Sequence, residues 1–533
     1  MSHAVSQSRG SAVEADRAAA RPRNRVTLFI LALWIAFLAR GAFHAVVAPM
    51  WDGFDEPGHL AYVAFIADHG RPPNFVENSF PTTYVEANKH LPSTVGVGAP
   101  PFKEWRAMTA DQRAHHRAMA AKITTERAAS DSYISGNYER QQGPLFYYLA
   151  TPAYLLVESL PLPKILVAMR LYCVLLASLT IPLAARLLRL LAGRRGVLIG
   201  LPIVALLPNT PFAVFRVSNE ALTWPLLAAI AVELVLAGVR RRDPLRLGIL
   251  ISAGIFTKLT LLPVFGAAML AMIAARRSRR IVAAAAIPLV AALALMAWNK
   301  IESGTITGLV QETGLRPTTM DDVGKAIDRM RSLPLLRQSL KHHAWSGGWG
   351  FVMPPDRVYA VAAAILITAI LAAVIAIRLR KRHVRAFRRA KLLIITFALL
   401  AGALVFHMFT GAIAAVKSPD FPTIGAEGWF FDMIRPIEAG LLAILFAAAI
   451  PARRTRFASQ LIIMLIVFAD LAGTTILMLP RWAGLDAGAN VAAAFRGAIE
   501  AAPLQRFAAL PLAFALLYFA SNLTAAISAR VKN

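Results

Sequence analysis

Apolar runs of membrane-spanning length alternate with short polar segments over nearly the whole chain. The first run, 26–47, is long enough to cross the roughly 30 Å hydrocarbon core of a bilayer as one helix. Runs of similar length recur to the C-terminus and predict about twelve spans. We therefore expect an all-α polytopic membrane protein.

The spans expected after the first follow one another with mostly short connections. They cover 164–191, 196–215, 219–238, 245–257, 259–275, 281–298, 358–377, 392–416, 434–450, 457–479 and 504–527. The run 145–160 is interpreted as an interfacial helix. Counting it as a span would place the arginines after residue 191 outside, against the positive-inside rule.

Two polar segments are longer than the other connections. The first, 48–143, is rich in proline, and its part near 108–129 has the pattern of an amphipathic juxtamembrane helix. The second is 299–357. The sequence thus divides into a cytoplasmic tail at 1–25 that we expect to be disordered, an N-terminal module at 26–298 including the external loop 48–143, the external loop 299–357, and C-terminal spans in 358–533.

Charge follows the same pattern. The formal net charge is +27, but the basic residues lie in short clusters between apolar runs, for example at 276–280 and 453–456. The positive-inside rule produces this distribution, so it argues for membrane orientation and against nucleic-acid binding. With these clusters inside, both termini are cytoplasmic and the two long loops are external. The single cysteine, Cys173, lies in an apolar run and excludes a disulfide framework.

Candidate chemistry is concentrated directly after the first span, in the segment 51–59. Two glycines and a proline there predict a loop, and the loop carries Asp52, Asp55, Glu56 and His59. Acids at the membrane edge are suited to act as a general base or to bind a divalent cation at Asp52 and Asp55. Alternatively, they form a solvated loop paired with basic residues. His59 either contacts a substrate phosphate or is an ordinary hydrogen-bonded interfacial histidine.

Several cations lie at similar depth on the external side. Lys258 is at the tip of a short apolar hairpin, and Arg170 and Arg435 lie near the external ends of two spans. They either bind a lipid phosphate or form structural ion pairs. Tyr147 either stacks on a sugar ring or belongs to an aromatic belt. Four more polar residues inside apolar runs are interpreted as interhelix contacts rather than proton relays: Glu233, His407, Glu438 and Asp470.

The segment Asp55-Glu56-Pro57-Gly58-His59 resembles the Asp-Glu motif of the GT-C superfamily of membrane glycosyltransferases. It is more similar to a bacterial subset with an Asp-Glu-Pro-x-His pattern. Five further segments agree with that subset in order, at 143–148, 169–171, 218–222, 256–260 and 345–351. Two positions depart from it. Gly143 stands where a proline is usual, and Trp429 where an arginine is expected, so Arg435 is the candidate substitute for that arginine.

The resemblance implies a GT-C-like fold and a hexosyl or pentosyl transferase of the bacterial inner membrane. The enzyme would move a sugar from a polyprenyl-phosphate donor to an extracytoplasmic glycan, lipid or protein acceptor. No cofactor is required, and a divalent cation at Asp52 and Asp55 stays an option. The implied catalytic residues are Asp55 and Glu56, and the implied substrate-binding residues are Lys258, Arg170, Arg435, His59, Asn219 and Tyr147.

Other classes of function remain open. A transporter or flippase of a lipid-linked or small anionic substrate would also be polytopic, but many such proteins are built from two similar halves. Here the large loop after the first span has no counterpart in the second half. A polymerase or ligase of lipid-linked O-antigen usually carries its main external loop late in the chain. A non-enzymatic scaffold is the third alternative.

Overall fold

A computed structural model of the chain describes residues 2–53, 55–74, 77–93, 98–124, 133–207, 210, 214–238, 245–258, 261–262, 264–266, 279–306, 318–345, 347, 352–379, 385–417, 432–504 and 509–529. Within them the chain is helical apart from one two-stranded antiparallel ribbon, in which Phe80 pairs with Ser135. The expected all-α class is confirmed.

The N-terminal half contains α1 (Ser2–Val47), α2 (Glu56–His69), β1 (Phe80–Pro81), α3 (Thr82–Asn88), α4 (Phe102–Ala107), α5 (Ala110–Ala120), β2 (Tyr133–Ser135), the 3-10 turn η2 (Tyr138–Gln141), α6 (Leu145–Leu155), α7 (Leu162–Ser178), α8 (Thr180–Leu206), α10 (Glu220–Gly238) and α11 (Leu245–Ile255). The remainder contains α13 (Arg279–Ser303), α14 (Met320–Arg331), α15 (Leu333–Ala344), α16 (Asp356–Leu379), α17 (Arg385–Lys417), α18 (Arg435–Ala449), η6 (Ala452–Arg454), α19 (Thr455–Ala472), the π-helix η7 (Gly473–Met478), α20 (Leu479–Trp482), α21 (Val491–Ala501) and α22 (Ala509–Ser528).

In the described part of the chain, seven segments are long and apolar enough to cross a membrane: Arg25–Val47, Leu162–Leu206, Ala284–Ser303, Asp356–Leu379, Leu393–Lys417, Ala452–Trp482 and Ala509–Ser528. This supports a multi-pass membrane protein. Other expected spans correspond to the shorter helices α10, α11 and α18. Most of the expected span 259–275 lies outside the described residues.

The long segment Leu162–Leu206 contains a sharp turn. Ala192 and Gly193 leave the helical conformation, and Gly193 has a φ of 65°, which glycine adopts without steric cost. The turn falls between the expected spans 164–191 and 196–215. The preceding α6 has 11 residues, too few to cross a bilayer, in agreement with its interpretation as interfacial.

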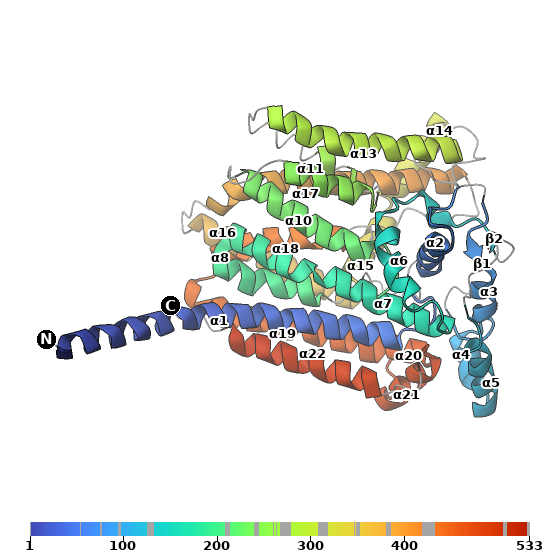
Figure 1. The fold of residues 1–533 in the computed structure, drawn as a ribbon, viewed down its shortest axis with the longest axis horizontal. Helices are drawn as coiled ribbons and strands as arrows, with labels where there is room; N and C mark the ends of the chain where they lie inside the picture. Colours follow the sequence, from blue (N-terminus) through green and yellow to red (C-terminus); the bar gives the residue numbers. More distant parts are fainter. Residues whose placement is uncertain are drawn as a thin grey trace.

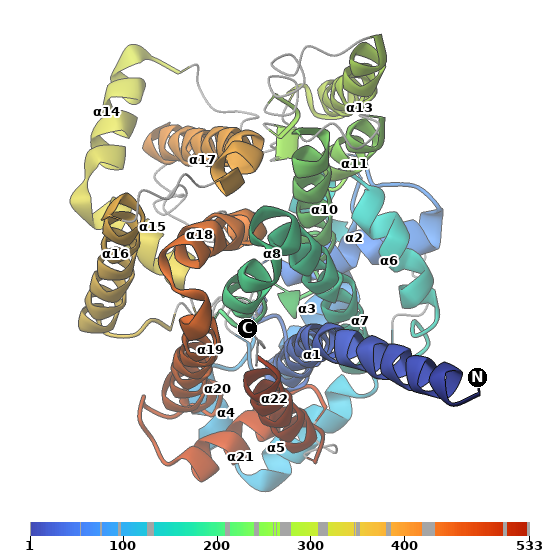
Figure 2. The ribbon, with the colours of Figure 1, turned by 90° about the vertical axis from the view of Figure 1, so that its left-hand side faces the viewer.

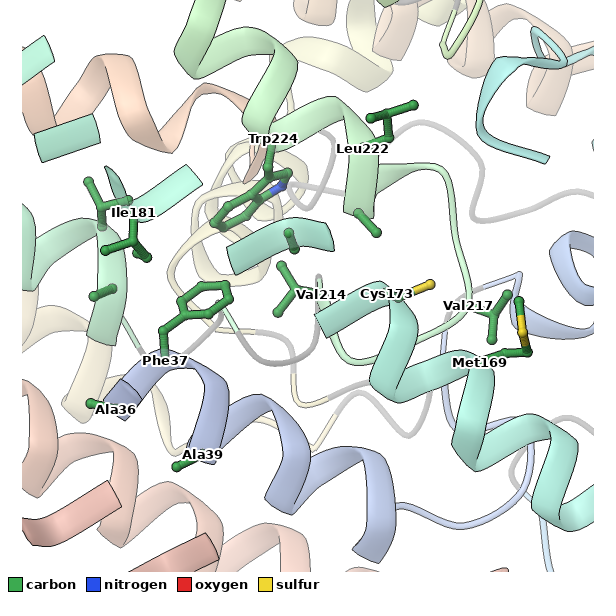
Figure 3. Packing of buried hydrophobic residues seen from close by; sticks show 14 of the residues in the cluster. Ala36, Phe37, Ala39, Met169, Cys173, Ile181, Val214, Val217, Leu222 and Trp224 are labelled. Carbon is green, nitrogen blue, oxygen red and sulfur yellow. The ribbon is translucent and has the colours of Figure 1, made fainter. Parts of the chain in front are cut away.

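The helices form a bundle with different contents at its two ends. Both termini lie at one end, and α2 to α5 with the β-ribbon lie at the other (Figure 1). Viewed from the terminal end, α8 is central and packs against α1, α10, α18 and α19 (Figure 2). Figure 3 shows Phe37, Ile181 and Trp224 among the buried side chains between α1, α8 and α10.

A buried ion pair inside the bundle accounts for one polar residue of an apolar run. Arg40 of α1 contacts Asp470 of α19 and also donates hydrogen bonds to the carbonyls of Leu206 and Leu207 at 3.0 and 2.9 Å. Asp470 is therefore an interhelix contact, as interpreted from the sequence.

One local expectation was wrong. The segment 51–59 is not a loop throughout, because α2 begins at Glu56. Pro57 lies in the first turn of α2, where its missing N–H leaves no helical hydrogen bond unmade. The segment 1–25, expected to be disordered, continues α1 back to Ser2, since it is rich in alanine and arginine, which favour helix.

Candidate functional site

The turn between α1 and α2 is built around the ion pair of Arg170 and Glu56. Arg170, on α7, donates from Nε and one terminal nitrogen to the two carboxylate oxygens of Glu56 at 2.8 and 2.6 Å. Its other N–H groups reach the carbonyls of Ala45, Ala48 and Pro49 at 3.4, 2.8 and 2.8 Å. All five N–H groups of the guanidinium therefore have partners that fix the path of the chain out of α1.

This ion pair changes the roles expected for two residues. Arg170 and Glu56 have fully buried side chains, and Glu56 also accepts a hydrogen bond from the backbone N–H of Val217 at 3.1 Å. The N–H donors of Arg170 are already used in this arrangement, and its expected role in binding the donor phosphate stays a prediction. Glu56 likewise holds the turn, and its expected catalytic role stays a prediction.

Asp55 is held in an unusual backbone conformation directly before α2. Its φ of 57° is in the left-handed region, which is strained for a residue with a side chain and is often found at functional sites. The hydroxyl of Tyr138 donates a hydrogen bond to its carboxylate at 3.1 Å. Burial raises the pKa of Asp55, while Arg216 and the Tyr138 hydrogen bond lower it.

The turn η2 brings Tyr138 and Glu139 to Asp55. The side chain of Asn137 donates to the Gly58 carbonyl at 2.6 Å and accepts from the Glu139 N–H at 2.9 Å. A β-carbon on Gly58 would lie 3.1 Å from Cγ of Glu139, so glycine allows this close approach. Sequence reasoning missed Tyr138 and Glu139; the only available signal was the polar sequence Tyr-Glu-Arg-Gln just before the chain returns to the bilayer.

His59, in the first turns of α2, lies near Glu139. Its Nδ1 is 2.8 Å from the Tyr147 hydroxyl, and Tyr147 stacks on Tyr62 with ring centroids 3.7 Å apart. Burial lowers the pKa of His59 to about 3, so the ring is neutral at physiological pH. Tyr147 is fully buried among these rings, where it positions His59 rather than forming an open platform for a sugar.

The cations next to Asp55 are Lys258 and Arg216. Both contact Glu220, the first residue of α10: Lys258 through one carboxylate oxygen, and Arg216 through the other at 3.5 Å. The chain approaches Arg216 closely at Gly53, where a β-carbon would lie 2.4 Å from Cβ of Arg216. The sequence correctly brought Lys258 near the acids but did not identify Glu220 as its partner.

Asn219 joins three of the motif segments. Its side-chain nitrogen donates to the side chain of Gln142 at 3.3 Å and to the Thr257 carbonyl at 3.1 Å. At Gly143 a β-carbon would lie 2.1 Å from the carbonyl oxygen of Phe256. Only glycine fits this approach. Asn219 is thus a positioning residue.

Arg435 lies in a second cluster. It donates to Asp432 at 3.1 Å and to the His343 carbonyl, and it lies 3.6 Å from Glu438. His343 in turn is 3.0 Å from Glu438. Burial raises the pKa of Asp432 to about 6. Trp429 lies outside the described residues, so the substitution of Arg435 for the missing arginine stays a prediction.

Asp52 faces away from this group. Its carboxylate accepts a hydrogen bond from the indole N–H of Trp482, in α20, at 3.0 Å, and the residue is buried. Among the described residues, no group of three or more His, Cys, Asp or Glu side chains is arranged to hold a metal ion. A cation at Asp52 and Asp55 stays a prediction, and these two acids contact different parts of the fold.

The comparisons with known proteins give one family match. Residues 143–402 match the family model of glycosyltransferase family 87. No curated protein and no solved structure matches the chain. The matched range contains Asn219, Glu220 and Lys258, whereas the turn with Asp55 precedes it. The match supports a membrane glycosyltransferase. Over residues 143–402 the chain is therefore similar to glycosyltransferase family 87, and its resemblance to membrane glycosyltransferases is confirmed.

Proposed function

We propose that the protein transfers a sugar from a polyprenyl-phosphate donor to an acceptor hydroxyl on the extracytoplasmic face of a bacterial inner membrane, with Asp55 as the catalytic base. The proposal rests above all on the position of Asp55. The Asp55 carboxylate, in a left-handed turn, accepts a hydrogen bond from the Tyr138 hydroxyl. It also lies in the electrostatic field of Arg216 and Lys258.

In this reaction Asp55 takes the proton of the acceptor hydroxyl while the hydroxyl oxygen bonds to the anomeric carbon of the donor sugar. The bond from that carbon to the phosphate oxygen breaks, and its electron pair leaves with the polyprenyl phosphate. Lys258 and Arg216 stabilise the charge that develops on the phosphate. The raised pKa of Asp55 makes it a stronger base than an exposed aspartate.

Glu220 sets a condition on donor binding. It already contacts both Lys258 and Arg216, so the donor phosphate must either share these two cations with the Glu220 carboxylate or displace it from them. Lys258 and Arg216 are the two cations that can pair with an anion at this position. A phosphate with one ester bond therefore fits better than a neutral headgroup.

The arrangement of the bundle supports the proposed orientation. Both termini lie at the end opposite α2 to α5 (Figure 1), and the basic clusters favour a cytoplasmic location for the terminal end. A single cysteine at the exposed position 111 tests this, because the native Cys173 is buried and should react little. Labelling of Asp111→Cys only from the cytoplasmic side would contradict the orientation.

Reconstituted protein and a panel of polyprenyl-phosphate hexoses and pentoses test the reaction. We expect release of polyprenyl phosphate together with a glycosylated product, identified by mass spectrometry. Movement of the intact donor between leaflets without any glycosidic bond formed would reject the transferase and favour the flippase.

A further inference from the structure

Glu139 is a buried carboxylate that the reaction described above does not use. The residue is 5% exposed, and its carboxyl group has a side-chain hydrogen bond with Gln142. Its Oε2 has no hydrogen-bond partner among the described residues. The nearest basic atom is Nδ1 of His59, at 3.7 Å, and that nitrogen already pairs with Tyr147. An acceptor oxygen left unpaired in a buried site costs folding free energy unless a ligand supplies the donor.

The fold holds Glu139 firmly in this costly position. The side chain of Asn137 accepts a hydrogen bond from the Glu139 N–H and donates one to the Gly58 carbonyl, and Gly58 provides the space for the Glu139 side chain. Tyr138, the preceding residue, contacts Asp55. The two carboxyl groups therefore lie close together. Burial raises the pKa of Glu139 most, and the nearby charge of Asp55 raises it further.

We propose that Oε2 of Glu139 accepts a hydrogen bond from a second hydroxyl of the acceptor, next to the hydroxyl that Asp55 deprotonates. Glu139 is then a positioning residue for a sugar ring with neighbouring hydroxyl groups. This excludes a serine side chain or a simple lipid alcohol as the acceptor, because each offers one hydroxyl. The inference rests on the proposed function and adds the chemistry of the acceptor to it.

If Glu139 served only to stabilise the fold, its replacement should lower the unfolding temperature. We expect no such loss. The pKa of Glu139 is raised, so the folded protein holds this proton more tightly than the unfolded chain does. Its ionisation therefore costs stability, and the cost grows as the pH rises from the unfolded pKa to the folded pKa. The variant Glu139→Gln has no such cost and should unfold at the same temperature as the wild type or higher at alkaline pH.

The direct test measures acceptor binding without donor. The probes are methyl hexopyranosides and methyl pentofuranosides, each with its monodeoxy analogues, and binding is followed by saturation-transfer NMR. We expect Glu139→Ala to weaken the best probe about tenfold, the typical effect of losing a hydrogen bond. The control Glu86→Ala removes an exposed carboxylate paired with Lys89 and should change nothing.

The monodeoxy analogues identify the contact. The wild type should bind one analogue about tenfold more weakly than the parent probe, and Glu139→Ala should bind the two equally. The inference would be overturned if the wild type and Glu139→Ala bound the parent probe equally, or if both showed the same preference for the parent over the analogue. It would also be overturned if no probe bound to the wild type. If binding depends on Glu139 but no donor yields a product, only the proposed transfer reaction fails.

Discussion

The hydroxyl of Tyr138 donates a hydrogen bond to the Asp55 carboxylate over 3.1 Å, although 83 positions of the chain separate them. Other contacts hold the two turns that carry these residues. Arg170 and Glu56 fix the turn before α2, and Asn137 fixes the turn that carries Tyr138. The position of Asp55 therefore depends on residues that never need to touch a substrate.

Replacing Tyr138 by phenylalanine should move the pH dependence of transfer. The hydrogen bond favours the ionised form of Asp55, so its loss raises a pKa that burial has already raised above the usual 3.8. Because the base must be ionised, activity falls as the pH drops through this pKa. The acid limb of kcat/KM against pH should therefore shift to higher pH in Tyr138→Phe.

Tyr172→Phe provides the control for this profile. Its hydroxyl donates to the Leu149 carbonyl at 2.8 Å, so the substitution removes a tyrosine hydrogen bond that does not involve Asp55. An identical acid limb in Tyr138→Phe and Tyr172→Phe would show that Tyr138 has no influence on the catalytic base.

Arg170→Ala should destabilise the protein severely. It leaves the carboxylate of Glu56 buried without its cation, and breaking a buried pair in this way costs about 3–5 kcal/mol. Unfolding followed by tryptophan fluorescence in detergent would measure the change. The exposed pair of Arg71 and Glu77 offers the comparison, since Arg71→Ala should cost about 1 kcal/mol or less. Similar losses in both variants would contradict the buried role of Arg170.

The contrast between Arg170 and Lys258 shows what could be predicted from the sequence. Both are cations at membrane depth, and composition and apolar periodicity located them and most of the spans correctly. The sequence does not reveal that Glu56 forms an ion pair with Arg170, because that pairing joins α2 to α7 through tertiary packing. Glu139 was missed for a related reason. Its place beside Asp55 depends on the contacts of Asn137 and Gly58.

Gly143→Ala should disturb the junction of the motif segments. The added methyl group would lie 2.1 Å from the Phe256 carbonyl oxygen, so the segment before α6 must move away from Lys258. We expect a loss of about 2 kcal/mol in stability, as for an overpacked site, and lower activity. Gly324→Ala is the control, because its added carbon meets no atom within 4 Å and alanine favours helix. A fully active, stable Gly143→Ala would contradict the close approach.

Lys258→Ala should weaken donor binding. Removing this cation leaves Glu220 with Arg216 alone and takes one positive charge from the phosphate position. We expect the KM for the donor to rise about tenfold, as for a lost charge-assisted hydrogen bond, with little change for the acceptor. The exposed Lys164, at the start of α7, provides the control Lys164→Ala. An unchanged donor KM would remove Lys258 from the site.

The most direct test of the central claim is single-turnover release of polyprenyl phosphate by Asp55→Asn, measured against Asp68→Asn. Asp68 accepts a hydrogen bond from the Tyr133 hydroxyl at 2.8 Å, so the control disrupts the same kind of contact in the same segment between α1 and α6. Asp55→Asn should fold and bind donor but release product at least a hundredfold more slowly, the contribution typical of a general base, while Asp68→Asn stays near the wild-type rate. Release at the wild-type rate by Asp55→Asn would contradict its role as the catalytic base.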